Sequence, residues 1–143
     1  CPFAIAIEKR QPRVKEIIAI EINPKAHKYA QENLILNKTK KIKLYNGDVK
    51  KILPTIKNKF DRIVMPLPKG AYSYLNLAYK KIKKQGIVHF YYWAHEKDLF
   101  TEAEKIVEEE AGKCNKRIKI LEKRKVLPYG PRIWKIVIDI LVL

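Results

Sequence analysis

Two carboxylates in this sequence stand where runs of strand-forming residues end. Glu21 closes the almost continuously apolar run 15–22, and Asp48 follows the run 42–45. A carboxylate at the first position can accept hydrogen bonds from both hydroxyls of a ribose, and one at the second can accept from the exocyclic amine of adenine. Gly47, just before Asp48, would leave room for the ring. A single acid at a strand end is more often a cap or an ion-pair partner, but two in succession favour a nucleoside-binding site.

A third strand-like run leads into two prolines. Residues 60–65 are followed by Pro66-Leu67-Pro68, which we call the proline corner. Proline fixes φ and has no N–H donor, so this segment ends any strand ladder and leaves a rigid, partly exposed backbone. Such a corner is either a plain turn between a strand and a helix or the wall of an active site.

Strand-like runs alternate with helical patterns through most of the chain. Strands are expected at residues 15–22, 42–45, 60–65, 86–93, 118–123 and 134–143, and helices at 3–9, 24–37, 49–53, 71–85 and 99–111. This alternation predicts βαβ units and a mainly parallel sheet, and the last two strands should form an antiparallel hairpin because no helix separates them. The fold class is therefore α/β, with the element order of a Rossmann-like class I methyltransferase. Ligands of such sheets bind at the carboxyl ends of the strands, where the two carboxylates and the proline corner should lie.

Length and apolar content predict one domain spanning residues 1–143. The first residues lack an initiator Met, and we expect a first strand and a glycine-rich turn to precede residue 1. No apolar run reaches the roughly 18 to 20 residues of a membrane-spanning helix, so no membrane partner is expected. Cys1 and Cys114 show no metal-ligand spacing, which predicts neither a metal site nor a disulfide and fits a reducing, cytoplasmic setting.

The charge of the chain is strongly one-sided. The sequence has 31 Lys and Arg against 15 Asp and Glu, a net charge of +16. Such an excess favours a polyanionic partner, since Lys and Arg gain affinity for a phosphate backbone by releasing counterions. A surface selected for heat tolerance is the alternative, although glutamate then usually rises together with lysine.

Several stretches together resemble a known family. They are Pro2-Phe3-Ala4-Ile5, Ile20-Glu21-Ile22-Asn23-Pro24, Asn46-Gly47-Asp48-Val49, Met65-Pro66-Leu67-Pro68-Lys69, Gly86-Ile87-Val88-His89-Phe90-Tyr91-Tyr92 and Tyr129-Gly130-Pro131-Arg132. In these stretches the chain is similar to the archaeal and eukaryotic tRNA (guanine-N1)-methyltransferases, which modify the guanine 3′ of the anticodon. The last two stretches are the most specific, because generic methyltransferases lack them.

The resemblance implies a cofactor, a partner and roles for particular residues. The cofactor would be S-adenosylmethionine and the partner tRNA, bound by a protein that is expected to be a monomer. Implied cofactor-binding residues are Pro2, Phe3, Glu21, Ile22, Asn23, Asp48, Val49 and Pro66; implied catalytic residues are Pro66, Leu67 and Pro68; implied RNA-binding residues are Lys69, Tyr129 and Arg132. The family's general base and its tRNA-recognition domains lie upstream of its cofactor loop, so upstream domains of the same protein are expected to be needed.

One departure from the family's pattern affects the chemistry. The family carries an Asn whose side-chain carbonyl can accept a hydrogen bond near the target base, and Pro66 stands there instead. Three alternatives remain open: an RNA-binding module without catalysis, a methyltransferase acting on another amine, and an aminocarboxypropyl transferase of the same fold. The sequence of the proline corner favours methyl transfer over the last of these.

Other side chains have less distinctive expectations. His89, within the predicted strand 86–93, is expected to be a hydrogen-bonded core histidine rather than a catalyst. The aromatic residues 90–93 could stack a base, but alternate members of a strand normally pack in the core. Arg132 is expected in a rigid loop at 126–132, and Tyr129 beside it could equally be a packing anchor.

Overall fold

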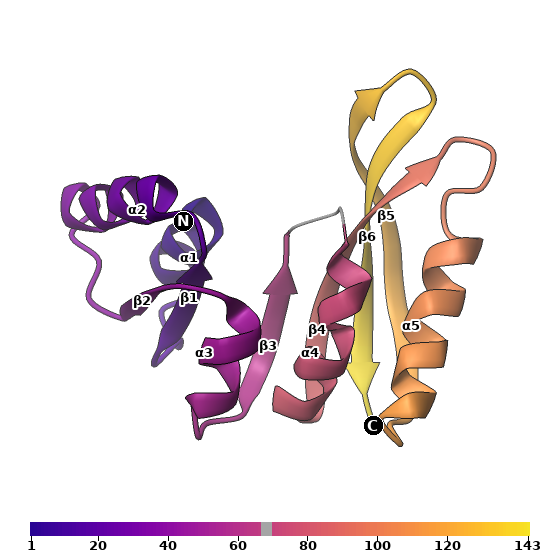
Figure 1. Ribbon diagram of the computed structural model, residues 1–143, viewed down its shortest axis with the longest axis horizontal. Helices are drawn as coiled ribbons and strands as arrows, with labels where there is room; N and C mark the ends of the chain where they lie inside the picture. Colours follow the sequence, from indigo (N-terminus) through magenta and orange to yellow (C-terminus); the bar gives the residue numbers. More distant parts are fainter. Residues whose placement is uncertain (67–69) are drawn as a thin grey trace. The chain divides into compact units, whose positions relative to one another are not determined.

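The computed structural model describes residues 1–66 and 70–143 of the chain and divides it into two compact units. The first unit is Cys1–Ile56 and the second is Lys57–Leu143. Figure 1 shows their elements in chain order. Among the described residues, no helix is both long and apolar enough to cross a lipid bilayer.

The first unit is a small βαβ arrangement. Its elements are α1 (Pro2–Arg10), β1 (Ile17–Glu21), α2 (Pro24–Leu36), β2 (Ile42–Asn46) and α3 (Val49–Thr55). β1 and β2 pair in parallel, with Ile17 opposite Ile42 and Glu21 opposite Asn46. The Glu8 carboxylate of α1 accepts from the backbone N–H groups of Lys40 and Lys41, at 2.8 and 3.2 Å, which ties this helix to the chain that enters β2.

The second unit is built on a four-stranded mixed sheet. Its elements are β3 (Phe60–Met65), the 3-10 helix η1 (Ala71–Tyr74), α4 (Leu75–Lys81), β4 (Ile82–His95), α5 (Thr101–Lys113), β5 (Ile118–Gly130) and β6 (Ile133–Val142). The strand order is β3-β4-β6-β5; β3 and β4 are parallel, and β6 is antiparallel to both of its neighbours. The predicted parallel pairing and the antiparallel hairpin at one edge are therefore confirmed.

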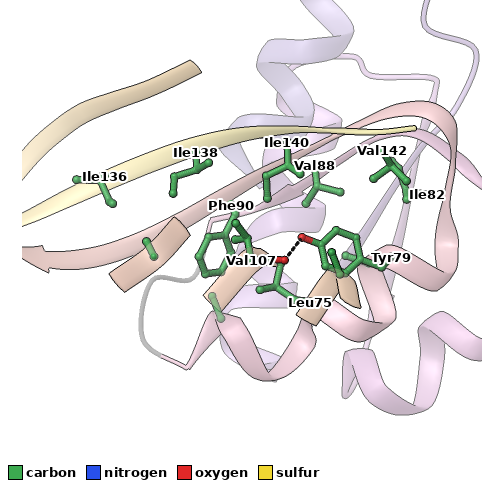
Figure 2. Close-up of a cluster of buried hydrophobic side chains, with 14 of the residues drawn as sticks. Leu75, Tyr79, Ile82, Val88, Phe90, Val107, Ile136, Ile138, Ile140 and Val142 are labelled. Carbon is green, nitrogen blue, oxygen red and sulfur yellow. Dashed lines mark hydrogen bonds between the residues drawn. The ribbon is translucent and has the colours of Figure 1, made fainter. Parts of the chain in front are cut away.

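The main core of the second unit lies between one face of its sheet and the helices α4 and α5. Alternate residues of β4 and β6 point into it, as a period of two requires. Figure 2 shows the largest fully buried side chains of this core, which come from the strands and from the helices: Leu75, Tyr79, Ile82, Val88, Phe90, Val107, Ile136, Ile138, Ile140 and Val142. The Tyr79 hydroxyl donates to the carbonyl of Val107 at 3.0 Å, and burial raises the pKa of this hydroxyl above its ordinary value.

Two sequence predictions about this unit are wrong. The helix predicted at 71–85 begins as the 3-10 helix η1 and ends at Lys81, because Ile82 takes an extended conformation and pairs with Phe60 of β3. The paired part of β4 resumes at Ile87, after Gln85 adopts a left-handed φ of 61°.

The loop predicted at 126–132 is also absent, because β5 continues to Gly130 and only Pro131 and Arg132 turn the chain into β6. β5 is an edge strand, and two of its three register shifts lie in this segment, between Lys125 and Leu127 and between Pro128 and Gly130. An edge position tolerates a proline that an inner strand would exclude.

Candidate cofactor site, proline corner and hairpin turn

Glu21 and Asn46 end the two strands of the first unit side by side. The Asn46 side-chain amide and the Gly47 backbone N–H both donate to the carbonyl oxygen of Glu21, at 2.8 and 3.0 Å. Glu21 Oε1 accepts from the backbone N–H of Asn23 at 2.9 Å. The carboxylate of Glu21 is thus positioned by the turn that leads into α2.

Asp48 caps the helix that follows β2. Its Oδ1 accepts from the backbone N–H of Lys50 at 2.8 Å, as an N-cap residue does. Gly47 before it has a φ of 144°, and a Cβ at this position would lie 2.9 Å from Cδ1 of Ile52. The backbone conformation therefore favours glycine, whereas the Ile52 side chain could shift to make room for a Cβ; Asp48 follows this glycine directly beyond the end of β2.

These two carboxylates leave acceptor capacity for a ligand. Each uses one oxygen on the backbone, and within the described residues no hydrogen bond is made to Glu21 Oε2 or Asp48 Oδ2. A ribose offers two hydroxyl donors and adenine offers an amino donor, so two acceptors at neighbouring strand ends match that donor set. The residues present therefore fit the nucleoside part of S-adenosylmethionine.

The neighbours of these carboxylates have less capacity for a ligand. Asn23 Oδ1 already accepts from the backbone N–H groups of Lys25 and Ala26, at 2.9 and 3.4 Å, so this side chain is an N-cap. Ile22 is 66% exposed and offers apolar surface next to Glu21, and Val49 is the first residue of α3. The assignment of these residues to the cofactor stays a prediction.

Pro2 and Phe3 lie at the start of α1. Pro2 lines an open hollow of about 350 Å³ together with Asn33 and Asn37, near the end of α2. Glu21 instead lies before Pro24, the first residue of α2, and so near the opposite end of that helix. Hydrogen bonds therefore link Glu21 to the turn before Asp48, whereas Pro2 lies beside residues near the end of α2.

Only the first residue of the proline corner is described. Pro66 is exposed and directly follows the end of β3 at Met65. Leu67, Pro68 and Lys69, predicted as two catalytic residues and one RNA contact, lie outside the described residues. Beyond them the chain resumes at Gly70, whose φ of 71° is left-handed.

Tyr129 and Arg132 lie at the end of the β5–β6 hairpin. The Tyr129 ring stacks on Trp93 of β4, with centroids 4.1 Å apart and planes 25° apart. Arg132 has a left-handed φ of 60°, and its Nε is 3.5 Å from Oε1 of Glu96, whose backbone N–H donates to the Arg132 carbonyl at 2.8 Å. These two predicted RNA contacts therefore share one turn, which is preorganised by a ring stack and a backbone hydrogen bond.

A polar network that the sequence did not predict crosses the other face of the second sheet. His89 Nδ1 is 2.7 Å from Oδ1 of Asp139, and Arg124 Nη2 donates to Oδ2 of the same carboxylate at 3.1 Å. Arg62 Nη1 lies 3.1 Å from His89 Nε2, and a guanidinium only donates, so Nε2 accepts and Nδ1 carries the proton given to Asp139. His89 is thus hydrogen-bonded as expected, but on the face away from the main core. An aspartate inside the apolar run 133–143 was the available signal.

Comparison with known proteins identifies the family. Residues 1–121 match the model of the TRM5/TYW2 methyltransferase domain. The chain belongs to this family. It is 35% identical over 138 residues to the tRNA (guanine(37)-N(1))-methyltransferase Trm5b of Pyrococcus abyssi, a match that covers 96% of this chain and 40% of that protein. It is also 27% identical over 137 residues to the tRNA(Phe) (4-demethylwyosine(37)-C(7)) aminocarboxypropyltransferase of Methanocaldococcus jannaschii, covering 96% of this chain and 54% of that protein.

Solved structures of the TRM5/TYW2 family share the fold. The crystal structure of P. abyssi Trm5b superimposes with a TM-score of 0.88 at 35% identity, covering 99% of this chain and 41% of that one. M. jannaschii TYW2 in complex with AdoMet gives a TM-score of 0.87 at 26% identity, covering 98% of this chain and 63% of that one. The methyltransferase fold predicted from the sequence is confirmed, and the chain spans about 40% of the length of the curated Trm5b.

Proposed function

We propose that this chain forms the S-adenosylmethionine-binding part of a tRNA methyltransferase that methylates N1 of the guanine 3′ of the anticodon. The observation that carries the proposal is the pair of carboxylates, Glu21 and Asp48, at neighbouring strand ends in a member of the TRM5/TYW2 family. The 35% identity of this chain to P. abyssi Trm5b, over 138 residues, supports the choice of guanine N1 as the methylated atom.

The residues of the chain bind and orient the reactants. Glu21 accepts from the ribose hydroxyls and Asp48 from the adenine amine, each through the carboxylate oxygen that the backbone leaves free. The bound cofactor supplies an electrophilic methyl group. Pro66 directs a backbone carbonyl toward the donor edge of the guanine, where a rigid acceptor orients N1 without an ordering cost. As N1 forms its bond to the methyl carbon, the bond from that carbon to the cofactor's sulfur would break, and the sulfur would leave as a neutral thioether. N1 would give up its proton, which upstream residues are expected to take.

A chimera tests this proposal directly. In it, the chain replaces the segment of P. abyssi Trm5b that it matches, so that the upstream part of the relative is supplied. Incubation with S-adenosylmethionine and a tRNA transcript, followed by nucleoside mass spectrometry, should yield 1-methylguanosine, and a transcript with adenine at the target position should not react. Methylation of another base, or none in a chimera that binds both substrates, would reject the proposal.

Aminocarboxypropyl transfer is the second candidate. The observation in its favour is the superposition on TYW2, whose TM-score of 0.87 nearly equals the 0.88 of Trm5b. The same mass spectrum distinguishes the two, because an aminocarboxypropyl adduct is heavier than a methyl adduct and requires a demethylwyosine-containing tRNA. An adduct of that kind from such a tRNA, with no methylation of unmodified guanine, would favour the second candidate.

A further inference from the structure

The part of β5 and β6 beyond the end of β3 forms a projecting hairpin. β3 ends at Met65, which pairs with Phe90 of β4, whereas β4 continues to His95 opposite Ile133 of β6. At about 3.4 Å per residue, this extension carries the hairpin roughly 17 Å past the end of β3. The projection itself is visible in Figure 1. Because β3 and β4 are parallel, the hairpin projects beyond their carboxyl ends, which is the end of the sheet where the proline corner begins. We call residues 123–137 the hairpin arm.

The hairpin arm carries positive charge without negative charge. Residues 123–137 contain five Lys or Arg and no Asp or Glu, whereas α5 of the same unit holds five glutamates against two lysines. A surface adapted only for solubility would mix the two signs. Lys123 pairs with Glu104 of α5 and Arg124 with Asp139, so the positive charge that remains for a polyanionic partner is that of Lys125, Lys135 and Arg132, whose pair with Glu96 is exposed.

Two of these cations lie over aromatic rings. Lys125 Nζ is 4.6 Å from the centroid of the Trp134 ring, and Lys135 Nζ is 4.9 Å from that of Tyr91. Within the described residues neither ammonium pairs with a carboxylate. A ring positions an ammonium without consuming its N–H donors, which stay available to phosphate oxygens.

Tyr129 forms a flat platform at the end of the hairpin arm. One face of its ring is covered by Trp93, which is itself half-buried, yet Tyr129 is 61% exposed. Its exposed surface therefore belongs to the other ring face and the ring edge. Leu127, 48% exposed nearby, adds apolar surface. Lys135 lies on the same face of the sheet as the ring stack, because it pairs with Trp93, whereas Lys125 pairs with the buried Ile136 and lies on the opposite face. A preoriented ring with one open face and a cation on its side of the sheet is the arrangement on which unpaired bases stack.

We infer that the hairpin arm binds unpaired nucleotides of an RNA, with Tyr129 stacking on a base and Lys135, on the same face of the sheet, contacting a flanking phosphate. A duplex keeps its base faces inside the helix and cannot offer one to Tyr129, whereas a single-stranded loop can. The inference rests on the proposed function, because it assigns to the hairpin arm the loop nucleotides near the target guanine.

Binding of two RNA probes to the 143-residue chain tests the stacking contact. One probe is a stem–loop with the sequence of an anticodon arm, and the other is a duplex of matched length and base composition. By fluorescence anisotropy, Tyr129→Ala should weaken stem–loop binding by roughly 5- to 150-fold and duplex binding by less than about twofold. Tyr129→Phe keeps the ring and should bind both probes like the parent chain.

Matched variants separate stacking from folding and charge. Tyr29→Ala removes an equally exposed tyrosine, 65% exposed on α2, and should leave binding of both probes unchanged. If Tyr129→Ala is not folded by circular dichroism, Tyr129→Leu keeps apolar bulk without the ring. Lys135→Gln should weaken both probes, and the slope of its log K against log salt should be shallower by about 0.7 to 0.9, whereas Lys125→Gln, on the opposite face of the sheet, should change that slope less.

The inference is overturned if Tyr129→Ala weakens both probes equally or no more than Tyr29→Ala does. It is also overturned if Lys135→Gln leaves the salt slope unchanged. Methyl transfer by the chimera is a separate measurement: an inactive chimera whose stem–loop binding still depends on Tyr129 rejects the proposed function and keeps the hairpin arm. A chimera that methylates tRNA, but whose stem–loop binding does not depend on Tyr129, keeps the proposed function and rejects the role of the hairpin arm.

Discussion

The two units of the chain differ most in how much apolar surface they bury. In residues 1–56, all of which the structure describes, only Ala4 and Ala30 are buried hydrophobic residues. The second unit has a continuous buried cluster formed by η1, α4, α5 and the strands β4 and β6. The candidate cofactor carboxylates thus belong to the unit with the weaker core, and the hairpin arm belongs to the unit with the stronger one.

This difference teaches where stability and binding are coupled. A parallel pair of only two strands is marginally stable by itself, and the first unit adds to it mainly caps and backbone hydrogen bonds. Regions that bind ligands are often drawn from the less stable parts of a protein. We therefore expect the cofactor to contribute to the order of the first unit, whereas the second should hold its shape without a ligand.

Matched core substitutions provide the largest test of this comparison. Ile138→Ala in β6 removes a fully buried side chain and should lower the free energy of unfolding by about 2 to 5 kcal/mol. Ile18→Ala in β1 removes a half-buried one and should cost markedly less. Urea denaturation followed by circular dichroism measures both. Equal costs would mean that the first unit is as well packed as the second.

Hydrogen exchange with and without cofactor sharpens the comparison. In the chimera, the Gly47 amide, which donates to the Glu21 carbonyl, should exchange much faster than amides of β4 and β6. S-adenosylmethionine at a hundred times its Kd should stabilise the first unit by up to about 2.7 kcal/mol and slow this exchange accordingly. The β4 and β6 amides should change little. Protection that rises in β4 and β6 but not at Gly47 would place the cofactor elsewhere.

Removal of one carboxylate tests whether that stabilisation passes through the predicted contact. Glu21→Ala in the chimera should weaken S-adenosylmethionine binding by roughly 1.5 to 3 kcal/mol, the scale of a charge-assisted hydrogen bond. Glu32→Ala removes an exposed carboxylate from α2 and serves as the control. Calorimetry that finds the same Kd for both variants would exclude Glu21 from the cofactor site.

Short capping and turn motifs made much of the fold predictable from the sequence, together with the positions of the two carboxylates at strand ends. Asn23 caps the start of α2 with Pro24 as its first residue, and Asp48 after Gly47 caps the start of α3. Each signal lies within four or five consecutive residues and needs no distant contact. The position of a side chain at a strand end follows directly from such signals. This is why the positions of Glu21 and Asp48 at the strand ends could be predicted without knowledge of tertiary contacts, while their role in binding the cofactor stays a prediction.

Features that depend on distant pairing were not predictable in this way. Ile82 fits the helical spacing of α4 equally well, and only its pairing with Phe60 makes it extended. Pro128 and Gly130 indicate a loop by composition, yet an edge strand accommodates them through register shifts. The Trp93–Tyr129 stack joins residues from separate strands, and no local pattern encodes it.

The polar network of the second unit gives a smaller stability test. Asp139→Asn keeps the volume but turns one acceptor toward Arg124 into a donor, so it should lower the free energy of unfolding by about 2 kcal/mol. Glu109→Gln, which breaks the exposed i,i+4 pair with Lys105, should change it by no more than about 0.5 kcal/mol. If the two variants melt alike, Asp139 contributes no more than a surface charge and the unit depends on its apolar core alone.

The smallest expected effect comes from replacing one cation in each unit and comparing RNA binding by the two variants. Lys38 in the first unit and Arg132 in the second are both cations with left-handed φ, 51° and 60°. Replacing either by glycine relieves backbone strain, so Lys38→Gly and Arg132→Gly should leave the free energy of unfolding unchanged or raise it by up to about 1 kcal/mol. RNA binding should respond differently, because only Arg132 belongs to the hairpin arm. Loss of Arg132 should weaken stem–loop binding and make the slope of log K against log salt shallower by about 0.7 to 0.9, the value for one phosphate contact, while Lys38→Gly leaves the slope unchanged. If both variants weaken RNA binding to the same extent, the net charge acts as a diffuse field and the hairpin arm has no special place in it.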